Sequence, residues 1–164
     1  MKHKTLPLLA LAASLSLLLA CNSADTDKTN PEVSVKAVQF RIARPTNQLK
    51  EVVNFYKEGL GLQELGHFEN HSGYNGVMLG LPDKTYHLEF TQQEQASPLP
   101  APTKEHLLVL YYDNEEEYKK ANDRLQNYGA HPVEPENPYW IGKSETYEDP
   151  DGWRIVLFNG TYTP

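Results

Sequence analysis

The sequence contains the same half-domain pattern twice, and this repeat limits the fold more than any other feature. Each copy begins with a strand, continues through a helix that ends at glycine, and closes with further strands. The copies cover about residues 35–94 and 105–162, and matching positions lie roughly 67 to 69 residues apart. A proline-rich connector, residues 95–104, joins them. Two such halves usually meet across a shared groove, so we expect a functional site there.

Apolar spacing and turn residues predict the elements of each copy. Residues 48–58 carry apolar side chains at helical spacing and end at Gly59, and we place the N-cap of this helix at Asn47. In the second copy, residues 115–128 form the matching helix and end at Gly129. The predicted strands cover residues 35–43, 62–68, 74–81, 85–91, 106–112, 144–148 and 153–159.

Residues 1–20 have the pattern of a bacterial export signal. Two lysines precede an apolar run that is too short to span a bilayer, and small residues lead directly into Cys21. This arrangement resembles a lipobox, in which cleavage before Cys21 leaves a lipid-modified cysteine. The alternative is an ordinary secretory signal with an incidental cysteine. Residues 21–32 are polar and predict a flexible tether, and residues 33–164 form one domain.

The charge of the exported chain restricts its partners. Loss of Lys2 and Lys4 with the signal changes the formal charge from −7 to −9, which excludes nucleic acid as an expected partner. An acidic protein is also repelled by anionic headgroups, so the lipid would have to hold it at the membrane. We therefore expect a protein that is lipid-anchored to the cell envelope. Asn22 follows the cysteine, which favours the outer membrane if the bacterium has two membranes.

Four short motifs resemble those of the vicinal oxygen chelate superfamily, which includes glyoxalase, bleomycin-resistance and dioxygenase-like proteins. They are Phe55-Tyr56 before Gly59-Leu60-Gly61, Leu88-Glu89-Phe90, Glu105-His106-Leu107, and Glu148-Asp149-Pro150-Asp151-Gly152 before the last strand. The resemblance covers nearly the whole domain. It implies an α+β fold in which two βαβββ modules form a curved mixed sheet around a cleft, and it leaves a homodimer open.

The same resemblance implies metal ligands on the first and last strand of each module. Carried over, these positions fall at Ala37, Glu89, His106 and Val156. Glu89 and His106 are suitable ligands, whereas alanine and valine side chains cannot bind a cation. The metal site is therefore incomplete, unless His87 or Gln39 supplies a different ligand set. A divalent metal ion stays open as a cofactor.

Alternation along the strands predicts a polar inner surface on the cleft. Our candidates for ligand binding are Gln39, Arg41, His87, Glu89, His106 and Arg154, with Tyr139 and Trp140 at the rim. In one interpretation, Glu89 is an ion-pair partner of Arg41 or Arg154. In another, the two arginines bind a carboxylate or phosphate of a small molecule.

These features predict a membrane-anchored protein that binds a small anionic or aromatic molecule in the cleft between the modules. One alternative is a metal-dependent enzyme, either a glyoxalase-like lyase or a fosfomycin-resistance-like transferase. Another is a non-catalytic interaction module of the cell envelope. The sequence contains no recognisable nucleophile motif or phosphate-binding loop, and we assign no catalytic residue.

Overall fold

The computed structural model describes residues 39–81 and 86–162. They belong to a compact unit that spans Ala37–Pro164. The expected signal peptide, Cys21, the tether and Ala37 lie outside the described residues. Within the described ranges, no helix is long and apolar enough to cross a membrane.

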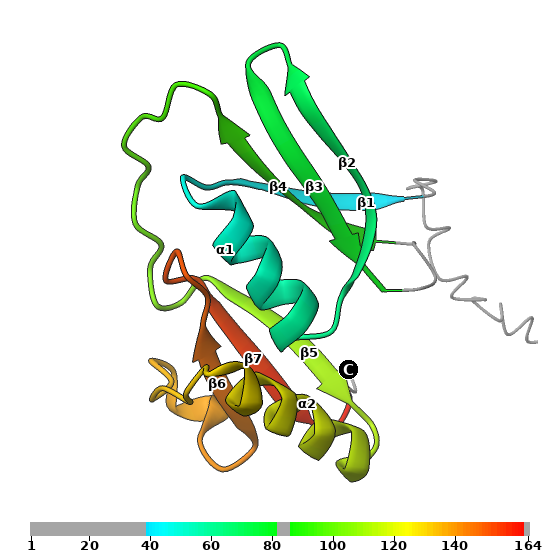
Figure 1. Ribbon diagram of the computed structural model, residues 1–164. Coiled ribbons are helices and arrows are strands. Elements are labelled where there is room, and N and C mark those ends of the chain that lie inside the picture. The colour runs from blue at the N-terminus through cyan, green and yellow to red at the C-terminus, as the bar shows by residue number, and fades with distance from the viewer. Residues whose placement is uncertain (1–38, 82–85, 163–164) are drawn as a thin grey trace, which may run out of the picture. The chain divides into compact units, whose positions relative to one another are not determined.

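The first module has the expected βαβββ order (Figure 1). Its elements are β1 (Phe40–Pro45), α1 (Leu49–Asn54), the π-helical turn η1 (Phe55–Gly59), β2 (Gln63–His71), β3 (Tyr74–Gly80) and β4 (Tyr86–Gln93). The strands form a mixed sheet in the order β1-β4-β3-β2, in which β1 and β4 are parallel and the other pairs antiparallel.

The second module repeats this plan with one strand fewer. Its elements are β5 (Leu107–Tyr112), α2 (Glu115–Tyr128), the 3-10 turn η2 (Pro138–Trp140), β6 (Ser144–Glu148) and β7 (Arg154–Asn159), with strand order β5-β7-β6. Residues 130–143 occupy the place of the missing strand. Pro132, Pro135 and Pro138 cannot donate to a strand ladder, and the Val133 nitrogen makes one backbone hydrogen bond to the Thr146 oxygen, at 2.8 Å. The predicted α+β fold of two modules is confirmed, but the second module is βαββ.

The two helices differ in how well the sequence predicted their ends. Helix α2 begins and ends as predicted, with the Asn114 side chain as N-cap and Gly129 in the left-handed conformation at φ 103°. Our N-cap for the first helix was wrong. The cap residue is Gln48, and the Asn47 side chain instead donates to the Ser97 carbonyl oxygen at 2.9 Å.

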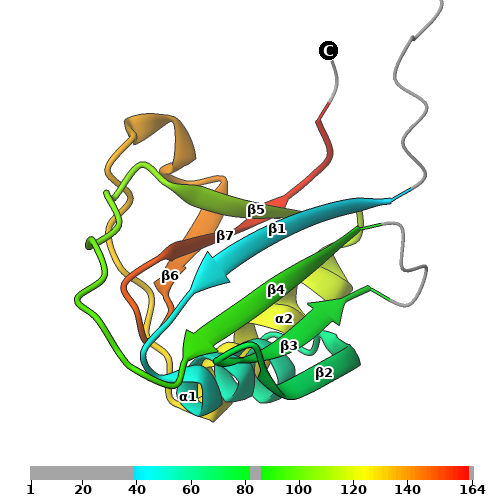
Figure 2. The same ribbon diagram turned by 90° about the horizontal axis from the view of Figure 1, so that it is seen from above.

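One apolar core joins the two modules. It includes Val52, Tyr56 and Phe90 of the first module together with Leu125 and Ile155 of the second. Figures 1 and 2 show that α1 covers the four-stranded sheet and that its end approaches α2. This approach depends on a glycine, because a Cβ atom at Gly59 would lie 3.2 Å from side-chain atoms of Leu125 and Tyr128. Each large apolar side chain buried here contributes about 1.5–3 kcal/mol.

Candidate functional site

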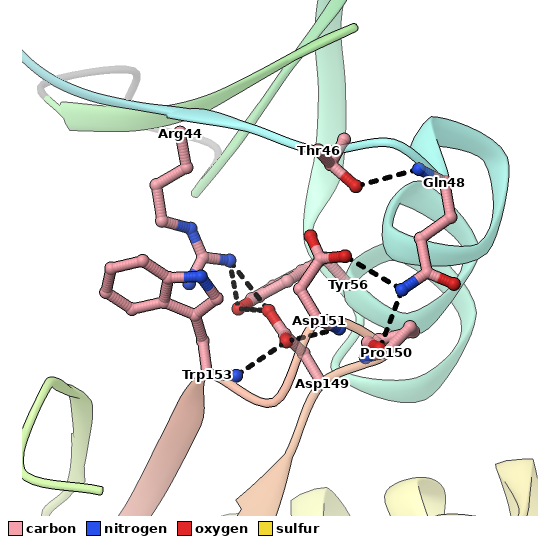
Figure 3. A network of polar contacts seen from close by, with 8 residues as sticks. All are labelled: Arg44, Thr46, Gln48, Tyr56, Asp149, Pro150, Asp151 and Trp153. Atoms are coloured by element: carbon pink, nitrogen blue, oxygen red, sulfur yellow. Dashed lines mark hydrogen bonds and ion pairs between the residues drawn. The ribbon is translucent and has the colours of Figure 1, made fainter. Parts of the chain in front are cut away.

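A buried carboxylate of the second module is held by side chains of the first (Figure 3). Asp149 lies in the Asp-Pro-Asp-Gly turn before β7, and its side chain is 0% exposed. One carboxylate oxygen accepts hydrogen bonds from the backbone nitrogens of Asp151 and Trp153, each at 2.9 Å. The other accepts from the Tyr56 hydroxyl at 2.9 Å and from the Arg44 guanidinium at 2.8 Å. A buried charge is tolerated when it is satisfied in this way.

Three aromatic rings surround the Arg44 guanidinium. Its central carbon lies 4.7 Å from the centroid of Trp153, 4.9 Å from Phe90 and 5.5 Å from Tyr56. Burial raises the pKa of the Tyr56 hydroxyl far above its usual value, and the Arg44 charge offsets part of this rise. Tyr56 therefore stays a neutral donor to Asp149. The network fixes Arg44 and the indole of Trp153 side by side (Figure 3).

A pocket of about 350 Å³ lies against this network. Its walls are mostly apolar and come from β1, β4, the start of β5 and the residue before β7. The lining residues are Ile42, Arg44, Leu88, Glu105, His106, Leu107, Leu108 and Trp153. The His106 ring stacks on Trp153, with centroids 5.4 Å apart and an angle of 18° between the planes. The pocket thus combines apolar side chains with the stacked rings of His106 and Trp153.

A second group of predicted residues lies on the other face of the first sheet. Leu88 and Phe90 belong to the core, so the alternating residues His87 and Glu89 point away from it. Arg41 lies opposite His87 in the parallel pair of β1 and β4. The Arg41 guanidinium contacts Glu89 Oε2 at 2.5 Å and donates from Nε to His87 Nε2 at 2.9 Å. The predicted ion pair between Arg41 and Glu89 is therefore present.

A third group surrounds a smaller cavity of about 200 Å³ in the second module. Arg154 and Trp140 both line it, together with Thr146 and Val156. Arg154 is nearly buried and donates to the Glu148 carboxylate and to the Glu134 carbonyl oxygen, so its charge is already compensated. Its ion pair with Glu148 excludes the alternative in which Arg154 pairs with Glu89.

The predicted rim residue Tyr139 is 55% exposed and lies outside this cavity. It packs edge-on against Trp140, and the Lys143 ammonium lies 3.9 Å from the centroid of its ring. Gln39, just before β1, is exposed as well. The eight predicted residues therefore do not form one site. Arg41, His87 and Glu89 lie together, Arg154 and Trp140 lie together, and His106 lines the larger pocket.

These placements do not fit a metal ion. Glu89 and His87 both contact Arg41, and His106 lines a different surface. Val156, at the fourth position carried over from the superfamily, is fully buried and has no donor atom. In the two described ranges there is no group of three or more His, Cys, Asp and Glu side chains that could hold a metal ion.

The sequence prediction missed several residues of the larger pocket. Arg44 was not a candidate, because the predicted first strand covered residues 35–43, whereas β1 extends to Pro45. Trp153 was not a candidate either, although it follows the Asp-Pro-Asp-Gly turn directly. The signal that could have found both is the motif itself. A buried aspartate in such a turn needs donors beyond the turn nitrogens, so the motif predicts that polar side chains of other elements meet it.

Comparison with known proteins gives matches over both modules. Residues 40–91 match the model of the YycE-like N-terminal domain, and residues 105–159 match that of the YycE-like C-terminal domain. The chain is 52% identical over 126 residues to the uncharacterized protein YycE of Bacillus subtilis (strain 168), an alignment that covers 77% of this chain and 91% of YycE.

Solved structures agree with this assignment. A crystal structure of a Bacillus subtilis YycE protein of unknown function has a TM-score of 0.75 and 50% identity, and it covers 80% of this chain and 96% of that protein. The antibiotic binding protein TnmS3 from Streptomyces sp. CB03234 shares the fold at a TM-score of 0.57 and 22% identity, over 78% of this chain and 98% of its own.

The fosfomycin resistance protein FosX from Mesorhizobium loti also shares the fold. Its TM-score is 0.58 at 15% identity, and the match covers 77% of this chain and 94% of FosX. At this identity the likeness concerns the fold alone. The sequence match to YycE extends over both modules at high identity, so it shows membership of the family and not only a shared fold. The chain belongs to the YycE-like family and has the glyoxalase/fosfomycin-resistance-like fold.

Proposed function

We propose that this protein binds a small aromatic molecule in the pocket beside Trp153. The observation that carries the proposal is the lining of the pocket, in which Ile42, Leu107 and Leu108 lie together with the stacked rings of His106 and Trp153. Ligand pockets are usually apolar with a few polar groups that fix orientation, and a volume near 350 Å³ suits a small ligand. Here the His106 imidazole and the Glu105 carboxylate provide the polar groups.

The charges in the pocket favour an aromatic ligand over an anionic one. Arg44 is the arginine that lines the pocket, and its guanidinium is paired with the fully buried carboxylate of Asp149. Its side chain is only 12% exposed. An anion would therefore meet a cation that is already neutralised, and Glu105 would repel it. TnmS3, which shares the fold, is described as an antibiotic binding protein, and this supports a binding role.

The test is a panel of small aromatic compounds, each paired with its carboxylated analogue, screened by thermal shift and measured by calorimetry. Ile42 is 41% exposed, so Ile42→Arg should leave the fold intact while it places a charged side chain in the pocket. We expect this variant to lose at least about tenfold in affinity, or 1.4 kcal/mol. The control is Ile141→Arg, which changes an exposed isoleucine outside the pocket. Equal affinities in both variants, or no binding by any compound, would refute the proposal.

We also propose that the exported protein is lipid-anchored through Cys21. The support is the sequence around this cysteine, with an apolar run and small residues directly before it. Two or three acyl chains on one residue would anchor it stably, since each buried methylene contributes about 0.8 kcal/mol. Metabolic labelling with palmitate tests this, and label that persists in Cys21→Ser would contradict it.

A homodimer is the third part of the proposal. In the described residues, β1 is an edge strand of the first sheet and pairs with β4. Strand β5 is an edge strand of the second sheet and pairs with β7. Both edge strands carry exposed aromatic side chains: Phe40 on β1 is 63% exposed and Tyr111 on β5 is 47% exposed. A second copy that covers these strands would remove an aggregation hazard. Sedimentation velocity should show a dimer that Phe40→Asp weakens and Tyr162→Asp, a change at another exposed ring, does not. A monomer at all concentrations would contradict it.

A further inference from the structure

The face of the first sheet that points away from the core carries a cation held between two potential metal ligands. Arg41 lies on β1, and His87 and Glu89 lie two residues apart on the neighbouring strand β4. All three side chains emerge on the same face. His87 and Glu89 are nearly buried, whereas the Arg41 side chain is 51% exposed.

The hydrogen bonds define the state of each group. A guanidinium can only donate, so His87 Nε2 must present its lone pair to Arg41 Nε, 2.9 Å away. Neutral His87 then carries its proton on Nδ1, which is buried and has no partner among the described residues. The Glu89 carboxylate contacts the same guanidinium at 2.5 Å. An imidazole lone pair and a carboxylate oxygen thus converge on one cation, as they do around a divalent metal ion.

We propose that the Arg41 guanidinium occupies the position of a divalent metal ion on this face of the sheet. Arginine keeps its proton in proteins, so the guanidinium stays a cation beside His87 and Glu89, and a metal ion would have to displace it. The site is therefore a latent metal site, which one substitution should open. This inference concerns a different surface from the proposed aromatic pocket and does not depend on it.

The experiment replaces Arg41 with a side chain that can bind metal. Arg41→His removes the guanidinium and adds a third donor to the pair His87 and Glu89, which would complete a set of two imidazoles and one carboxylate. The probe is cobalt(II), titrated into protein without a histidine tag and followed by visible absorption and calorimetry. We expect one equivalent to bind to the variant, at least tenfold more tightly than to the wild-type protein.

Two further variants make the result specific. Adding Glu89→Gln to Arg41→His should weaken cobalt binding at least tenfold, because it removes the carboxylate. Arg41→Ala removes the guanidinium without adding a donor and should bind cobalt more weakly than Arg41→His but more tightly than wild type. If Arg41→His does not fold, as judged by circular dichroism, Arg41→Ala carries the test.

Two results would overturn the inference. One is stoichiometric cobalt binding by the wild-type protein that is abolished by Glu89→Gln, since the guanidinium would then not exclude a metal ion. The other is the same weak binding in wild type and in the folded Arg41 variants, since the position of the guanidinium would then not be a metal position.

Discussion

Asp149 joins the two modules through one buried carboxylate, and its loss should be costly. Asp149→Ala would leave the Arg44 guanidinium buried without its ion-pair partner and two backbone donors of the turn without an acceptor. Removing one partner of a buried ion pair typically costs about 3–5 kcal/mol. We expect a loss of this size in the free energy of unfolding, measured with urea. The control is Asp151→Ala, which removes one contact to Gln48 and should cost less than about 1 kcal/mol.

Tyr56 makes stability dependent on pH at the alkaline end. Burial raises the pKa of its hydroxyl above the usual value of 10.0 in the folded state, so above pH 10 the unfolded chain loses this proton and the folded protein keeps it. Its contribution is therefore complete below pH 10 and is lost as the pH rises further, by about 1.4 kcal/mol per pH unit. In Tyr56→Phe the free energy of unfolding should fall less steeply between pH 10 and 11. Parallel curves would contradict this assignment.

Single residues also show where sequence analysis was sufficient. The pairing of Arg41 with Glu89 follows from alternation and charge, and both were predicted as candidates on one face. The role of Arg44 did not follow, because its partner Asp149 is 105 positions away in the sequence. Spacing along a strand gives the face of the sheet on which a side chain lies. It does not give the distant residue that meets it there.

At the level of elements, the contact between η1 and α2 depends on the absence of a side chain at Gly59. A Cβ atom there would lie 3.2 Å from Leu125 and from Tyr128, so a branched side chain would force the helices apart. Overpacking of this kind costs about 1–3 kcal/mol. Gly59→Val should lower the free energy of unfolding by that amount, whereas the neighbouring exposed site should tolerate Glu58→Val. Equal stability of the two variants would show that the contact is not tight.

Helix α2 and strand β6 could be predicted with their exact ends, because local signals determine them. Asn114 and Gly129 cap the helix, and the Asp149 turn ends the strand. Apolar spacing and turn residues predicted the three strands that the second module has, whereas the motif resemblance implied four strands in each half. The prolines of residues 130–143 were the available signal. Prolines cannot donate to a strand ladder, which agrees with the absence of a strand between α2 and β6 in this described segment.

For the whole molecule, the repeat in the sequence predicts the two modules but not how they meet. The structure packs the helices of both modules into one core, and the predicted cleft residues separate into three groups. Alternation predicts which residues of one strand share a face, as His87 and Glu89 do on β4. Which residues share a pocket depends on the packing between the modules. Gly59 and Asp149 contribute to this packing, and no single sequence motif encodes it.

The most direct test of the account is the fluorescence of Trp153 during ligand binding. The chain has two tryptophans, so in a Trp140→Phe protein Trp153 is the sole indole and forms one wall of the proposed pocket. We predict that an aromatic compound that raises the melting temperature also changes the Trp153 emission, to saturation and with the dissociation constant found by calorimetry. A compound that binds with full affinity while the Trp153 emission stays unchanged would contradict the assignment of this pocket.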